Sequence, residues 1–218
     1  PGRLDESPGA LGEQPPPFVA ARRIGSLGDE GALAAPHLEQ AGGPSPEIEF
    51  NRGVCDLNEG RTESALAGFD RALELEPADD DLGRVRFLRG YCLKELGRWS
   101  DAIDDLERSI ELESPDLAHL NLLGFCLFKL GRYAEAVTSF ERAVALDPTS
   151  AVDWANIAVN LERLGDNARA EDLYRKALGM DPSIGFAGEG LERLGGRGPL
   201  QWQWQWQWQW QWQWQWQW

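Results

Sequence analysis

The sequence predicts an all-α fold, an α-solenoid of stacked antiparallel helix pairs closed by a C-terminal capping helix. Apolar residues recur at helical spacing through a segment rich in Leu, Ala, Glu and Arg, which runs from residue 46 to about residue 196. Within this segment a glycine recurs about every 34 residues, with a proline between successive glycines. A repeat of this length is typical of a helix pair that stacks on its neighbours. The glycines are Gly60, Gly97, Gly131 and Gly165, at spacings of 37, 34 and 34 residues, and the prolines are Pro77, Pro115, Pro148 and Pro182.

Each unit is predicted to be a helix, a tight turn and a second helix. Glycine suits the end of the first helix because it tolerates a positive φ angle. Proline cannot continue a helix, so it marks the end of the second one. The three extra residues of the first interval fall on Asp79, Asp80 and Asp81, which are predicted to form a solvated loop that caps the next helix. The predicted units are residues 46–79, 83–116, 117–150 and 151–184.

Small residues recur at equivalent places inside these helices. A glycine within a helix costs about 1 kcal/mol relative to alanine, so a recurrent one predicts that the two helices of a unit approach closely. Alanines and large residues repeat in the second helices with the same spacing. The series are Gly53, Gly90, Gly124 and Ala158 in the first helices, and Ala65, Ala102, Ala136 and Ala170 with Phe69, Leu106, Phe140 and Tyr174 in the second.

This pattern resembles the tetratricopeptide repeat family. The resemblance rests on the 34-residue period and on motif residues that are clearest in the third unit, and it covers residues 46–184. The first unit departs from the family, with Arg52 where leucine is favoured and Asp56 where an aromatic residue is favoured. The second unit has Ser114 before its proline. The motif residues of the third unit are Leu123, Gly124, Ala136, Phe140, Ala143 and Pro148.

Three further segments flank the predicted repeats. Residues 1–45 are rich in Pro, Gly and Ala and are predicted to be a disordered arm. Residues 185–197 are predicted to form the capping helix, because residues 190–195 repeat the pattern of 161–165; the alternative is a frayed tail. Residues 198–218 contain nine Gln-Trp pairs, which could self-associate as cross-β or could be a translated six-base repeat at the end of a gene.

The resemblance implies a site for a partner. In this family a concave groove lined by the first helix of each unit usually binds other proteins. Side chains placed on that face by helical spacing are apolar and aromatic in the middle of the array, which favours a peptide or an amphipathic helix with apolar anchors. The alternative is that they pack internally, or that the N-terminal arm covers them. The predicted groove residues are Phe50, Val54, Arg84, Phe87, Tyr91, Lys94, Asn121, Phe125, Phe128 and Val159.

Two arrangements known in the family do not match this sequence. Co-chaperones of the family hold a chaperone's terminal carboxylate with basic and Asn side chains, and the equivalent positions here offer no charged donor. An asparagine ladder, as in sugar-transferring relatives, is incomplete, with only Asn51 and Asn156. A chaperone-tail clamp is therefore not expected. The clamp positions hold Phe50, Val54, Leu88, Ala118 and Leu122.

Charge and composition argue against several classes of function. The formal net charge of -15 disfavours nucleic acid and anionic membranes as partners, and no apolar run is long enough to span a bilayer. Cys55, Cys92 and Cys126 occupy equivalent places, which favours packing between helices over metal or redox chemistry. The two histidines, His37 and His119, have no cysteine or acid at ligand spacing. No catalytic residue, metal or cofactor is therefore expected.

The sequence as a whole predicts a protein–protein interaction scaffold, expected in the cytoplasm, rather than an enzyme. The mechanism would be a rigid groove that is formed before its partner binds. Two other hypotheses stay open. One is a structural protein that self-assembles through the Gln-Trp tail, and the other is the truncated regulatory arm of a larger enzyme.

Overall fold

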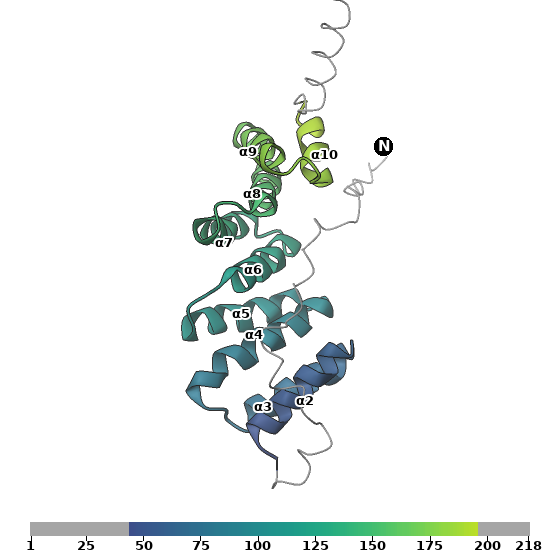
Figure 1. Ribbon diagram of the computed structural model, residues 1–218, viewed down its shortest axis with the longest axis vertical. Helices are drawn as coiled ribbons and strands as arrows, with labels where there is room; N and C mark the ends of the chain where they lie inside the picture. Colours follow the sequence, from purple (N-terminus) through teal and green to yellow (C-terminus); the bar gives the residue numbers. More distant parts are fainter. Residues whose placement is uncertain (1–43, 196–218) are drawn as a thin grey trace, which may run out of the picture.

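The computed structural model describes residues 44–195, and within them the chain is all-α, with nine helices and no strand. The helices stack along the long axis of the molecule (Figure 1), so the predicted solenoid with its capping helix is confirmed. The predicted arm, apart from residues 44 and 45, and the Gln-Trp tail lie outside the described residues. The helices are α2 Pro46–Asn58, α3 Thr62–Glu74, α4 Asp79–Glu95, α5 Trp99–Leu112, α6 Leu117–Lys129, α7 Tyr133–Leu146, α8 Ala151–Arg163, α9 Asn167–Met180 and α10 Gly185–Arg193.

The first and second helices of each unit are joined by a turn that depends on glycine. Gly97 has a φ of 74°, a left-handed conformation that other residues rarely adopt. The N–H of the next residue, Arg98, then donates to the carbonyl of Leu93 at 2.9 Å, which satisfies a helix-end acceptor. The same conformation recurs at the three other predicted turns, Gly60, Gly131 and Gly165, with φ of 76°, 73° and 82°.

The small residues of the first helices allow close packing within a pair, as predicted. A Cβ added at Gly124 would lie 2.7 Å from the Cζ atom of Phe140, and one at Gly53 would lie 2.8 Å from Phe69 Cε1. Both glycines are buried against a ring that a larger residue would displace. The alanines of the second helices, Ala65, Ala102, Ala136 and Ala170, are 0% exposed in one continuous core.

The acidic segment Asp79–Asp81 differs from its prediction. These residues do not form a loop but make up the first turn of α4, which is 17 residues long, and all three are exposed. The helix begins right after Pro77 and Ala78, four residues before the start predicted for the second unit. The physical reason is that carboxylates are stabilised at the positive end of a helix dipole.

A polar cluster takes the place of the family's aromatic residue in the first unit. Asp56 is only 6% exposed and accepts hydrogen bonds from Ser64 Oγ at 2.6 Å and from Arg61 Nε at 3.0 Å. The bond from Ser64, together with Arg61, lowers the pKa of Asp56 despite its burial. Although Asp56 departs from the family pattern, its hydrogen bonds therefore still connect the end of α2 to the start of α3.

Helix α10 covers the end of the array. Its residues Ala187 and Leu191 are fully buried, and Gly190 lies against the ring of Tyr174 on α9. Arg193 also reaches back to Glu162 of α8, with its Nε atom 2.9 Å from Glu162 Oε1. The buried face and the ion pair agree with a cap rather than a frayed tail. Across residues 44–195 no helix is long and apolar enough to cross a membrane.

Candidate partner-binding face

Half-buried side chains on α2, α4, α6 and α8 form a surface that we call the first-helix face. It consists of the ten residues predicted to line a groove, of which nine are half-buried and Lys94 is only 9% exposed. The apolar members, such as Phe87 and Phe125, also pack against the core. The side chains of this face are therefore partly packed against the core and partly exposed. This is intermediate between an open groove and a fully internal position, the two possibilities that the sequence left open.

Cations lie against aromatic rings along this face. The guanidinium carbon of Arg84 on α4 is 4.9 Å from the centre of the Phe50 ring on α2. On the same helix, the Nζ atom of Lys94 is 4.6 Å from the Tyr91 ring. Further along, Lys129 Nζ is 5.5 Å from the Phe125 ring on α6. In such contacts the cation is attracted to the face of the ring, which restricts the position of the long Lys or Arg side chain.

Ring contacts link neighbouring units across the face. Phe87 of α4 stacks on His119 of α6 with 4.1 Å between centroids, and Trp99 of α5 meets Phe125 edge-on at 5.7 Å. None of His119, Trp99 and Lys129 is among the groove residues predicted from the sequence. Lys129 could have been found, because it follows Phe125 by four residues on the same helix. Trp99 starts a second helix, and its approach to Phe125 depends on how the units stack.

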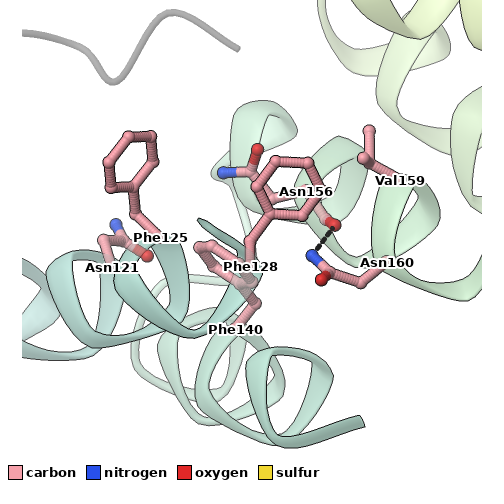
Figure 2. A pocket seen from close by; sticks show the side chains of 7 residues that line it. All are labelled: Asn121, Phe125, Phe128, Phe140, Asn156, Val159 and Asn160. Carbon is pink, nitrogen blue, oxygen red and sulfur yellow. Dashed lines mark hydrogen bonds between the residues drawn. The ribbon is translucent and has the colours of Figure 1, made fainter. Parts of the chain in front are cut away.

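A pocket opens between α6 and α8 (Figure 2). Three groove residues predicted from the sequence, Asn121, Phe125 and Phe128, line it from α6, and Val159 lines it from α8. The structure brings these four residues together, whereas Phe50, Val54, Arg84, Phe87, Tyr91 and Lys94 belong to α2 and α4. The other residues that line the pocket are Phe140, Asn156 and Asn160.

Two amide oxygens in this pocket have no hydrogen-bond donor. Asn160, 1% exposed, donates its Nδ2 to the carbonyl of Asn156 at 2.8 Å (dashed line in Figure 2). Asn121 donates its Nδ2 to Asp153 Oδ2 at 3.4 Å. Both nitrogens face an acceptor, so the direction of each amide is set, and both Oδ1 atoms are left buried without a partner among residues 44–195.

These unpaired oxygens are energetically unusual. A buried acceptor without a donor destabilises a fold by about 1–3 kcal/mol. An N–H group that entered the pocket would remove that penalty. The nearby Asp153 is 3% exposed, and burial raises its pKa even though Ser150 and Asn121 donate to it. The chemistry of the pocket is therefore that of a hydrogen-bond acceptor with apolar walls.

Comparisons with known proteins agree with this architecture. A family model described as "Tetratricopeptide repeat" matches residues 116–183, and one described as "Anaphase-promoting complex, cyclosome, subunit 3" matches residues 58–143. The chain is a tetratricopeptide repeat protein. No curated protein sequence matches it.

Solved structures share the fold of this tetratricopeptide repeat protein. The crystal structure of YrrB, described as a TPR protein with an unusual peptide-binding site, is 22% identical, with a TM-score of 0.63 over 67% of this chain and 74% of that one. The structure of MamA 41-end from Desulfovibrio magneticus RS-1 is 20% identical, with a TM-score of 0.59 over 71% of this chain and 95% of that one. At these identities the likeness concerns the fold.

The cysteines of the tetratricopeptide repeats are free and packed between helices. Cys92 and Cys126 are 0% exposed, and Cys55 is half-buried. Desolvation raises the pKa of each of the two buried thiols to about 12. The expectation that neither histidine has an acid nearby is wrong for His119, which is buried beside Asp116 with 2.7 Å between Nδ1 and Oδ1. Among the described residues no group of three or more His, Cys, Asp or Glu side chains could hold a metal ion.

Proposed function

We propose that this tetratricopeptide repeat protein is a protein-interaction scaffold whose first-helix face holds an extended segment of a partner protein. The observation that carries the proposal is the pair of buried, unpaired amide oxygens of Asn121 and Asn160 in the pocket between α6 and α8. An incoming peptide offers the missing N–H donors on its backbone or on an amide side chain. YrrB, which shares this fold, is described as having an unusual peptide-binding site, and this supports the same class of ligand here.

The pocket is too small to enclose a side chain, but an apolar side chain of the partner can cover its apolar walls from outside. Phe125, Phe128 and Val159 are half-buried, so part of each ring or methyl group can still be covered by a ligand. Burial of such surface stabilises a complex by roughly 25 cal/mol per Å² before the entropic cost of association is subtracted. An apolar anchor next to an N–H donor would use both features of the pocket together.

The face is organised before a partner arrives. Arg84 and Lys129 are held against rings, and Asn121 and Asn160 are oriented by their own hydrogen bonds. Little side-chain freedom would then be lost on binding, which favours affinity without a conformational change. We propose a binding function and no catalytic one.

A selection from random peptides tests the proposal. The full chain would be used to select binders from a library of randomised dodecapeptides, and a labelled consensus peptide would then be titrated by fluorescence anisotropy. Phe125→Ala should weaken binding by roughly tenfold or more, as expected for an aromatic anchor. Trp154→Ala is the matched control, because Trp154 is also half-buried on α8 but lines a different pocket with Ile157 and Leu173.

Two outcomes would contradict the proposal. Either no peptide is enriched over a mock selection, or Phe125→Ala and Trp154→Ala weaken binding equally. Circular dichroism at 222 nm would check that both variants keep their helices. Asn121→Leu adds a second test, because it removes the unpaired oxygen, and with it the amide that donates to Asp153, but keeps the branching of the side chain; it should weaken binding.

A further inference from the structure

The charged residues of the first-helix face are basic, whereas the chain as a whole is acidic. The protein has 36 acidic and 21 basic residues, and most of its described arginines pair with acids. Just before the second helices, for example, Arg98 lies 2.6 Å from Asp101 and Arg132 lies 2.6 Å from Glu135. An unpaired cation is therefore the exception among residues 44–195.

Two of the exceptions are on the first-helix face or at its edge. Within residues 44–195, Arg84 and Lys129 form no ion pair, and each instead lies against a ring. Lys129 is exposed at the end of α6, between the rings of Phe125 at 5.5 Å and Trp99 at 5.9 Å. Lys94 differs, because it is buried and pairs with Glu95.

We propose that the partner segment carries an acidic side chain, Asp or Glu, which binds Lys129 beside the apolar residue that covers the neighbouring pocket. This inference rests on the proposed function and names the chemistry of its ligand. Phe125 belongs to both sites, since it lines the pocket and contacts Lys129, so the acid and the apolar anchor must be close together in the partner. Arg84 offers a second cation for an acid further along the segment.

Charge also limits how acidic that segment can be. The net charge of -15 repels a long run of acidic residues before contact is made. A carboxylate that reaches Lys129 gains a charge-assisted hydrogen bond, which is stronger than a neutral one. The balance favours one or two acids among neutral, apolar residues. A polyanion such as nucleic acid does not fit this description.

The test uses the full chain and the peptides selected from the dodecapeptide library. Sequencing should show Asp or Glu enriched at a fixed distance from an apolar position. A labelled consensus peptide and its analogue with the acid replaced by Gln would be titrated against the wild type, Lys129→Glu and Lys176→Glu. Lys176 is the matched control, because its Nζ atom also lies over a ring, 3.0 Å from the centre of Trp154, which lines a different pocket.

The expected result has three parts. Lys129→Glu lowers the affinity for the acidic peptide by roughly tenfold or more, as expected for a close charge pair. Lys176→Glu changes that affinity by less than about twofold. The Gln analogue binds the wild type more weakly than the acidic peptide does. Its affinity also falls much less than that of the acidic peptide when Lys129→Glu replaces the wild type. A peptide with Lys at the acidic position binds Lys129→Glu better than it binds the wild type.

Failure of this inference differs from failure of the proposed function. If peptides are selected and depend on Phe125 but show no acidic preference, or if Lys129→Glu and Lys176→Glu have equal effects, the acidic partner is wrong and the scaffold stands. If no peptide is selected, or none depends on Phe125, the proposed function fails and this inference fails with it. Lys129→Gln, which removes the positive charge without adding a negative one, separates loss of attraction from new repulsion.

Discussion

The ring of Tyr174 fills the space that a side chain at Gly190 would need, since an ideal Cβ there would lie 2.3 Å from the Cζ atom of Tyr174. Gly190→Ala should therefore destabilise the docking of α10 by about 1–3 kcal/mol, the usual effect of overpacking a core. Gly188→Ala is the control on the same helix, because no atom lies within 4 Å of its added Cβ. That change should be neutral or stabilising by up to about 1 kcal/mol.

Urea unfolding followed by circular dichroism would measure both changes. Tryptophan fluorescence is less suitable, because nine of the 11 tryptophans belong to the Gln-Trp repeat. Amide hydrogen exchange over residues 185–193 would show local loss of the cap directly. Equal stability of the Gly190→Ala and Gly188→Ala proteins would contradict the packing argument.

Gly124 and Phe140 should behave as a coupled pair. A Cβ at Gly124 would lie 2.7 Å from Phe140 Cζ, whereas at the equivalent pair of Gly90 and Leu106 the nearest atom is 3.1 Å away. Gly124→Ala should destabilise the fold by about 1–3 kcal/mol, and adding Phe140→Leu should recover part of that loss. A double-mutant cycle of unfolding free energies checks this, and additive effects would refute the coupling.

Glu162 should make the capping of the array depend on pH. Burial opposes its ionisation, but hydrogen bonds from Arg193 and from Tyr174 Oη, at 2.7 Å, outweigh that effect and lower its pKa below the ordinary 4.5. A lowered pKa means that the folded state binds the proton more weakly than the unfolded state. The stabilisation is therefore complete above the ordinary pKa and is lost as the pH falls through the lowered value.

Glu162→Gln should accordingly lower the free energy of unfolding at neutral pH and matter less and less as the pH falls below the ordinary pKa of 4.5. Urea titrations of wild type and variant at a series of pH values would give this difference. Glu192→Gln is the control, because Glu192 is exposed on α10 and forms no ion pair within residues 44–195. A difference between wild type and Glu162→Gln that stayed constant with pH would show that the ion pair does not contribute.

The three cysteines should differ in reactivity towards a maleimide. Cys92 and Cys126 are fully buried with pKa values of about 12, so little thiolate forms at neutral pH and the reagent cannot reach it. Cys55 is half-buried and should react first. Mass spectrometry of peptides after timed labelling would give the order, and adding urea should make all three react. Rapid native labelling of Cys126 would contradict the packing of α6.

Local rules in the sequence were enough to predict the repeat architecture. The positive φ of Gly60, the close approach at Gly53 and the burial of Ala65 depend on backbone conformation and on side-chain volume. These properties recur at the same position in each repeat, so the prediction for one repeat supports the prediction for the others. The same spacing placed Asn121 and Phe125 on one helix face, which the structure joins in a pocket, while their role in binding stays a proposal.

Only the tertiary structure decided how the units meet. The contact between Lys129 and Trp99, the stacking of Phe87 on His119 and the unpaired oxygen of Asn160 all depend on stacking angles and side-chain rotamers between units. The sequence predicted a loop over Asp79–Asp81, whereas α4 begins at Asp79. An acidic run is compatible with a solvated loop and with a helix N-terminus, so the sequence could not separate the two. The sequence by itself determined the repeating unit, because its signals are local, and the structure determined the surface, because contacts between side chains of different units create it.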